Sequence, residues 1–171
     1  IGHDKVVSSL AQSLEQGMIS HAYLFTGPEG VGKMALALNL AQALNCTSQE
    51  RPCGVCTQCR RTIEGKHADV QVISLGNGQD GQSTGRKQIG IDRIEDMQRS
   101  AGLQPFEGAY KLFIIDGAEG LTAEAANRLL KTLEEPAPTV CIVLLSADDS
   151  RLLPTVFSRC QSYGLRPLPL E

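Results

Sequence analysis

The sequence lacks long apolar runs, a strong charge of either sign and any internal repeat. Its longest apolar stretches fall far short of the roughly 18 residues that a membrane-spanning helix needs. The net charge is −3, so no general basic field would hold nucleic acid, and any contact with DNA must be local or made by partners. No secretory or transit segment is visible, and we expect a cytoplasmic protein without a membrane partner.

The length and the two ends of the chain bear on its domain organisation. With 171 residues, 42% of them hydrophobic, the chain can bury one substantial core, which predicts a single domain over 1–171. It begins at Ile1 rather than Met, and it ends with PLPLE shortly after an expected strand. We therefore expect it to be a piece of a longer protein.

A glycine-rich segment follows the apolar run 22–25 and precedes a helix-like stretch. Its sequence, GPEGVGK at 27–33, matches the phosphate-binding loop pattern G-x-x-x-x-G-K between a strand and a helix. The glycines allow backbone N–H groups to surround an anion, and the lysine can reach the β- and γ-phosphates. The predicted nucleotide cradle comprises Gly27, Gly30, Val31, Gly32, Lys33 and Met34.

Two positions lack the groups that ATP hydrolysis needs. The P-loop lysine should be followed by Ser or Thr, whose hydroxyl coordinates Mg²⁺, but Met34 stands there. Asp116 ends an apolar strand and can support Mg²⁺, with a simple turn cap as the alternative. The Glu that normally follows is replaced by Gly117, and Glu119 cannot be assumed to take its place. We expect the chain's own ATPase activity to be absent or very weak, and binding of ATP with Mg²⁺ stays open.

Four of the six cysteines lie close together in the sequence: Cys46, Cys53, Cys56 and Cys59. Two disulfides are the alternative to a metal site, but a P-loop chain without an export signal belongs in a reducing compartment. Three of these cysteines also lie too close for two unstrained bridges. Four thiolates suit tetrahedral Zn²⁺, and Gly54 supplies the turn. We predict a structural zinc site in an insertion at about 46–66, with His67 as an alternative ligand and with Cys141 and Cys160 in the core.

Buried strands and helices alternate along the chain. Helices are expected at 4–15, 33–45 and 91–101 and from an N-cap at Thr122 to before Pro136; strands at 22–26, 69–75, 110–115, 140–145 and 160–165; and a polar loop at 76–88. Strands that are buried on both faces indicate a parallel α/β sheet covered by helices. The fold class is therefore a P-loop NTPase fold with an inserted zinc knuckle.

Three strings together with the cysteine knuckle resemble the bacterial DNA polymerase III clamp loader: HAYLFTGP at 21–28, AANRLLKTLEEP at 125–136 and LPTVFSRC at 153–160. The resemblance covers essentially the whole chain. It implies an AAA+-type, RecA-like domain, with the lid and collar domains of the full protein outside this sequence. It also implies partners: the other subunits of a hetero-oligomeric ring and, through them, the sliding clamp and primer-template DNA.

Two subunit types of that family share this module, the motor type gamma/tau and the delta prime type. The segments 89–92 and 103–116 are more similar to delta prime, and Met34 and Gly117 depart from the motor type. The resemblance implies that Arg159 completes, in trans, the ATP site of a neighbouring motor subunit, where a guanidinium neutralises charge on the γ-phosphate. Ser146 matches a sensor position, with a strand cap as the alternative.

Two other functions stay open at this point. One is an active ATPase of the gamma/tau type, against which Met34 and Gly117 argue. The other is a zinc-dependent nucleic-acid-binding module unrelated to clamp loaders. Glu50, Glu64 and the acidic total weigh against that module, but basic residues surround the cysteines: Arg51, Arg60, Arg61 and Lys66.

Overall fold

The computed structural model describes residues 3–75 and 88–168. Five strands form one parallel sheet: β1 (Ala22–Thr26), β2 (Val70–Ser74), β3 (Lys111–Asp116), β4 (Val140–Ser146) and β5 (Gln161–Gly164). The helices are α1 (Asp4–Glu15), α2 (Lys33–Asn45), α3 (Thr57–Ile63), α4 (Ile91–Ala101), α5 (Ala123–Glu134) and α6 (Pro154–Phe157), with short 3₁₀ turns η1 (Ala118–Gly120) and η2 (Asp149–Arg151).

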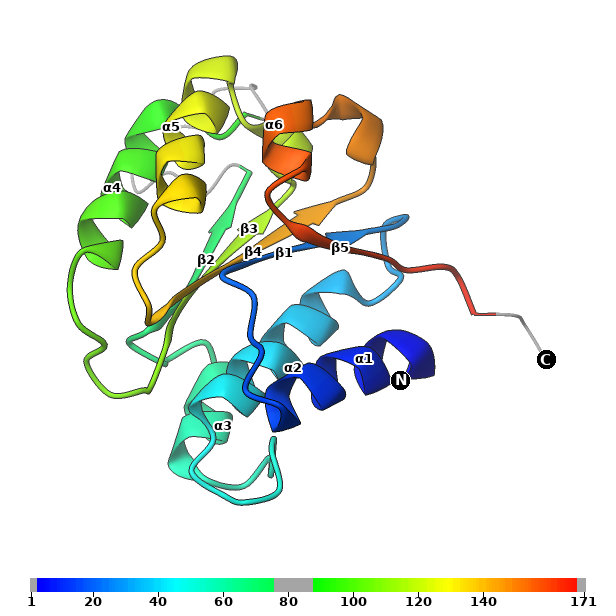
Figure 1. Cartoon of the computed structure of the whole chain (residues 1–171), viewed down its shortest axis with the longest axis vertical. Helices are drawn as coiled ribbons and strands as arrows, with labels where there is room; N and C mark the ends of the chain where they lie inside the picture. The colour runs from blue at the N-terminus through cyan, green and yellow to red at the C-terminus, as the bar shows by residue number, and fades with distance from the viewer. Residues whose placement is uncertain (1–2, 76–87, 169–171) are drawn as a thin grey trace.

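The strand order β2-β3-β4-β1-β5 decides which helix lies on which face of the sheet. From β1 the chain crosses to β2 at the far edge, returns through β3 and β4, and then passes β1 to reach β5. Parallel crossovers are right-handed, so this reversal of direction puts α2 on one face and α4, α5 and α6 on the other. Figure 1 shows α1 and α2 below the sheet and α4, α5 and α6 above it.

The central strands are buried on both faces. In β1, Ala22 and Leu24 pack into the cluster that contains the α4 and α5 side chains, while Tyr23 and Phe25 pack into the cluster of α1 and α2. Every residue of β4 is buried. Two separate cores therefore hold the sheet between its helices, as the continuous apolar strands predict.

The predicted helices at 4–15, 33–45 and 91–101 are confirmed with those bounds. The predicted cap is also confirmed, because the Thr122 hydroxyl accepts a hydrogen bond from the Ala125 N–H at 3.1 Å. Local signals suffice for these elements, because the apolar spacing and the cap residue both lie within one short stretch of sequence.

Other expectations need correction. The strand predicted at 160–165 spans only 161–164, the one at 110–115 runs from Lys111 to Asp116, and β2 is shorter by one residue at each end than predicted. Helices α3 and α6 were not predicted. The polar loop predicted at 76–88 lies outside the described residues except for Gln88.

The carboxyl ends of β1, β4 and β3 lie side by side at one edge of the sheet. The P-loop follows β1, Ser146 ends β4 opposite Thr26, and Asp116 ends β3 opposite Leu145. Open α/β sheets bind ligands at this edge. In the part of the chain that the structure describes, no helix is long and apolar enough to cross a membrane.

Candidate nucleotide cradle and metal site

The P-loop backbone requires glycine at three positions. Gly30 and Gly32 have φ of 76° and 102°, in the left-handed region. Gly27 has φ of 148°, and a Cβ there would lie 2.5 Å from the Leu165 carbonyl oxygen. Gly32 is the N-cap of α2, so the loop leads into a helix N-terminus, where anions bind.

The Lys33 side chain turns back onto the loop. Its Nζ donates hydrogen bonds to the carbonyl oxygens of Gly27, at 2.5 Å, and Pro28, at 2.9 Å. Lys33 and Asp116 both line a cavity of about 400 Å³ at the loop, together with Gly30, Gly32 and Met34. Phosphate oxygens would form stronger, charge-assisted bonds with this ammonium than the two carbonyls do. The geometry of the cradle therefore suits an anion.

Gly117 is held in a conformation that glycine favours. Its φ is 79°, and a Cβ at this position would lie 3.0 Å from Leu75 Cδ1. The turn brings Glu119 into a second cavity, of about 190 Å³, which Lys33 and Asp116 also line. Glu119 Oε2 is buried and has no hydrogen-bond partner in the described residues. The sequence did not predict Glu119 at the cradle, because its position there depends on the left-handed turn at Gly117.

Ser146 is fully buried at the end of β4. Its hydroxyl donates to the Asp148 carbonyl at 2.9 Å and accepts from the Asp148 N–H at 3.2 Å. Its own carbonyl accepts from the Gly27 N–H at 3.1 Å and so ties β4 to the P-loop. These contacts are those of the strand cap that the sequence allowed, and the sensor role stays a prediction.

Arg159 lies after α6 and lines neither cavity at the cradle. Its Nη1 donates to the Thr155 carbonyl at 2.9 Å, and its Nη2 donates to Glu134 Oε1 at 2.7 Å. The side chain is 34% exposed. Sequence reasoning missed Glu134, because nothing local links two residues that lie 25 positions apart.

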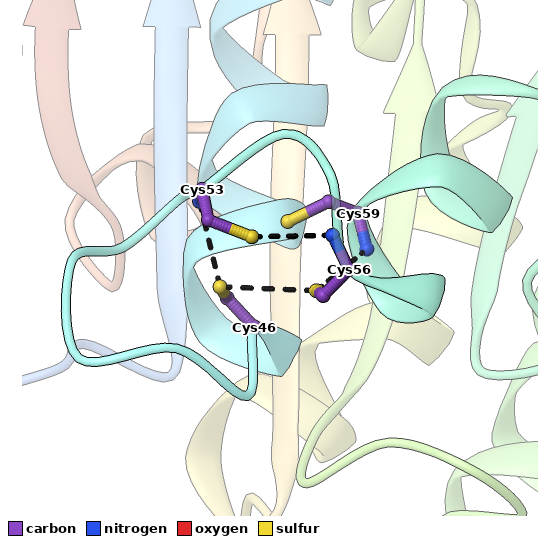
Figure 2. A group of neighbouring side chains, drawn as sticks. All are labelled: Cys46, Cys53, Cys56 and Cys59. Atoms are coloured by element: carbon purple, nitrogen blue, oxygen red, sulfur yellow. Dashed lines mark hydrogen bonds between the residues drawn. The ribbon is translucent and has the colours of Figure 1, made fainter.

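The four clustered cysteines come together beside the end of α2 and the start of α3 (Figure 2). Their sulfur atoms all lie within 4.8 Å of one another, and the distance from Cys46 Sγ to Cys56 Sγ is 3.9 Å. All six cysteines of the chain are free thiols, and Cys141 is buried in the core as predicted. The cluster can hold a metal ion.

Backbone N–H groups point at the sulfurs of the cluster. Cys53 Sγ accepts from Val55 and Cys56, which lowers the pKa of Cys53 below its ordinary value. The N–H groups of Thr47 and Cys59 lower the pKa of Cys56 to about 5, whereas burial raises the pKa of Cys59 to about 12. Hydrogen bonds to sulfur favour the thiolate, which is the form that binds metals.

His67 is engaged elsewhere. Its Nδ1 accepts from the Asp69 N–H at 3.0 Å, so its Nε2 carries the proton and donates to Gln58 Oε1. Burial lowers the pKa of His67, in agreement with a neutral ring. Both ring nitrogens have partners outside the cysteine cluster, which leaves the four thiols as the ligand set.

Two of the basic residues near the cysteines pair with acidic side chains. Arg61 contacts Glu107 at 3.2 Å, and Lys66 contacts Glu64 at 3.8 Å. These pairs reduce the positive charge around the knuckle and weaken the case for a separate nucleic-acid-binding module.

The comparison with known protein families matches residues 2–169 to the model of "DNA polymerase III, delta subunit". The chain belongs to this family. It is 38% identical to the delta' subunit of Bacillus subtilis over 96% of its length and 36% identical to the tau subunit of Escherichia coli over its whole length. It spans 47% of the length of that delta' subunit and 25% of that tau subunit.

Solved structures agree with this family assignment. A gamma subunit-related protein of DNA polymerase III from Thermotoga maritima superimposes with a TM-score of 0.67 at 25% identity, over 94% of this chain and 46% of that one. The RuvB branch migration motor of the same organism shares the fold at 16% identity and a TM-score of 0.54, over 97% of this chain and 45% of that one. The parallel P-loop NTPase sheet predicted from the sequence is thus confirmed, with AAA+ proteins as its neighbours.

Proposed function

We propose that this chain is the AAA+-type module of a delta prime-like clamp-loader subunit. In this proposal it is a scaffold that supplies Arg159, in trans, to the ATP site of a neighbouring subunit for sliding-clamp loading in DNA replication. The observation that carries the proposal is the separation of functions. The phosphate cradle keeps its glycines and Lys33, the two groups that hydrolysis requires are missing, and the arginine lies away from the chain's own cradle.

The loss of hydrolysis is supported by backbone geometry as well as by residue type. Met34 offers no oxygen to Mg²⁺. A Glu in place of Gly117 would have to adopt a left-handed conformation against Leu75. The local backbone is therefore adapted to glycine at the position where an active ATPase carries its water-polarising carboxylate.

An active gamma/tau-type ATPase is the second candidate. The 36% identity to the Escherichia coli tau subunit favours it, because that value is close to the 38% identity to a delta' subunit. Identity therefore does not separate the two types. Met34 and Gly117 support the delta prime type, since each stands where the motor type needs a catalytic group.

We also propose that the cysteine cluster holds a structural Zn²⁺. With Zn–S bonds of about 2.3 Å, the sulfurs of a tetrahedral site lie about 3.8 Å apart. The 3.9 Å between the Cys46 and Cys56 sulfurs fits this spacing. All four sulfurs lie within 4.8 Å of one another, so small inward shifts would bring the set to a tetrahedral site. Four thiolates complete the coordination shell, so the ion would hold the knuckle together and take no part in chemistry.

The experiment is reconstitution of a complete clamp loader with the full-length protein, either wild type or Arg159→Ala. The variant should assemble normally, because this side chain is partly exposed and a small part of any interface. DNA-stimulated ATP hydrolysis should fall by the fraction of total turnover that this one ATP site contributes. Clamp loading should fall further, because loading requires all the ATP sites of the complex. Unchanged loading by a correctly assembled complex would refute the role in trans.

A further inference from the structure

The Arg159 guanidinium is held at two points by its own chain. Nη1 donates to the Thr155 carbonyl and Nη2 to Glu134 Oε1. We infer that Glu134 is a positioning residue for Arg159, so that the guanidinium faces the neighbouring ATP site already ordered. This inference rests on the proposed trans role of Arg159.

The two anchors belong to well-packed elements. Glu134 is the last residue of α5, whose Leu129 and Leu133 are buried in the core, and Thr155 lies in α6 beside the buried Val156. Figure 1 shows α5 and α6 next to each other on the same face of the sheet. A side chain that is anchored to such elements has a more closely defined position than one on a free loop.

The hold leaves donors available for a second partner. A guanidinium has five N–H groups in a rigid plane, and these contacts use two of them. A free arginine loses side-chain entropy when it is fixed in one rotamer. Glu134 orders the Arg159 side chain before the neighbouring subunit binds. Less entropy is therefore lost when Arg159 engages the neighbour's ATP site.

The carboxylate also offsets some of the positive charge, which acts in the opposite direction. Glu134 is 50% exposed and Arg159 34% exposed, so water and salt screen their attraction. Ion pairs that are this exposed contribute little to stability. We therefore expect orientation to dominate over neutralisation, and removal of the carboxylate to leave the fold intact.

Glu135 provides a matched control. It is the next residue, exposed and of the same charge, and it forms no ion pair within the described part of the chain. A change that acted only through net charge near the end of α5 would appear equally in Glu134→Ala and Glu135→Ala.

The test compares full-length Glu134→Ala, Glu134→Gln, Glu135→Ala and Arg159→Ala, and the double variant Glu134→Ala/Arg159→Ala, in reconstituted loaders. Glu134→Ala should lower the Arg159-dependent part of DNA-stimulated ATP turnover by about threefold to tenfold, as a misplaced catalytic group does. Glu134→Gln keeps an acceptor oxygen and should restore part of the loss. Glu135→Ala should match wild type, and the double variant should be no worse than Arg159→Ala alone.

Three results would overturn the inference while Arg159→Ala still lowers turnover: wild-type turnover with Glu134→Ala, an equal loss with Glu135→Ala, or a further loss in the double variant. A rise in turnover with Glu134→Ala would also overturn it, because it would make Glu134 a restraint on Arg159. If Arg159→Ala itself has no effect, the proposed function fails and the inference falls with it.

Discussion

At Gly117 the backbone has φ of 79°, and the next side chain to reach the cradle is that of Glu119. The turn after β3 thus fits glycine at position 117, and a carboxylate there would need a change of backbone as well as of side chain. Met34, by contrast, occupies an ordinary helical position in α2, where a hydroxyl residue would fit. The two departures differ in how easily they could be reversed.

This difference gives a prediction for Met34→Thr. The substitution returns a hydroxyl for Mg²⁺ to the first turn of α2, but it leaves Gly117 without a carboxylate, so ATP turnover should remain negligible. The measurement is turnover by the purified protein, with Lys33→Ala as the background control. A rate of about one per second or more, abolished by adding Lys33→Ala, would contradict the prediction and favour a motor ATPase.

Asp69 is a buried residue with a structural effect that the sequence did not signal. It is 2% exposed, and its carboxylate accepts hydrogen bonds of 2.7 Å from each of three consecutive N–H groups, those of Phe106, Glu107 and Gly108. Burial raises the pKa of Asp69, but the three N–H donors together hold it below its ordinary value. The charged form therefore stabilises the loop before β3.

Asp69→Asn should destabilise the protein by about 1–3 kcal/mol at pH 7, because an amide leaves a backbone N–H without an acceptor. The folded pKa lies below the unfolded value of about 3.9, so this contribution is fully present above that value and is lost as the pH falls through the folded pKa. Urea unfolding at pH 7 and at pH 3 measures it, and the difference between the two proteins should be smaller at the lower pH.

The exposed Asp96, which pairs with Arg99 at the surface, is the control for this measurement. Asp96→Asn should change the free energy of unfolding by less than about 0.5 kcal/mol. An equal loss at both sites, or an Asp69→Asn difference that persists unchanged at pH 3, would show that the three hydrogen bonds are not its source.

At the scale of elements, the knuckle joins α2 to α3. Cys46 caps the end of α2, the Cys56 sulfur accepts from the Cys59 N–H at the start of α3, and the Gln42 amide donates to the Cys59 carbonyl at 3.0 Å. Helix α3 spans only seven residues, too few to be stable alone. Its order therefore depends on the cluster and on α2.

Cys56→Ser should lose the proposed Zn²⁺ and unfold 46–66 locally, because metal binding and local folding are coupled in small metal sites of this kind. The sheet should persist, since its two cores lie elsewhere. Metal content by mass spectrometry, after purification without added metal, and amide hydrogen exchange across 46–66 provide the readouts. Cys160→Ser, outside the cluster, should keep the metal; a metal content near zero in reduced, folded wild type would refute the zinc assignment.

The elements that could be predicted are those with a local signature. Thr122 and the apolar spacing after it define α5, and the glycines and lysine at 27–33 define the cradle. Helix α3 was missed because TQCRRTI has no apolar periodicity and is held by its cysteine and by Gln42. The approach of Glu119 and the contact of Glu134 with Arg159 depend on a backbone turn and on packing between separate helices, which no local pattern encodes.

At the scale of the whole molecule, two functional regions are separated. The cradle lies at the carboxyl edge of β1, β3 and β4, whereas Arg159 follows α6 and is tied to Glu134 at the end of α5. Figure 1 shows α5 and α6 next to each other on one face of the sheet. One region can bind an anion within the chain, and the other presents a cation at the surface. This separation is what the proposed role of Arg159 in trans requires.

The most direct test of this account is to place Lys33→Ala and Arg159→Ala, each in the full-length protein, separately into otherwise wild-type clamp loaders and to measure DNA-stimulated ATP turnover. Arg159→Ala should lower turnover by about the fraction that one ATP site contributes. Lys33→Ala should leave turnover close to wild type, because the proposed function assigns no hydrolysis to the chain's own cradle. Loss of turnover with Lys33→Ala and none with Arg159→Ala would contradict the account and identify this chain as a motor subunit.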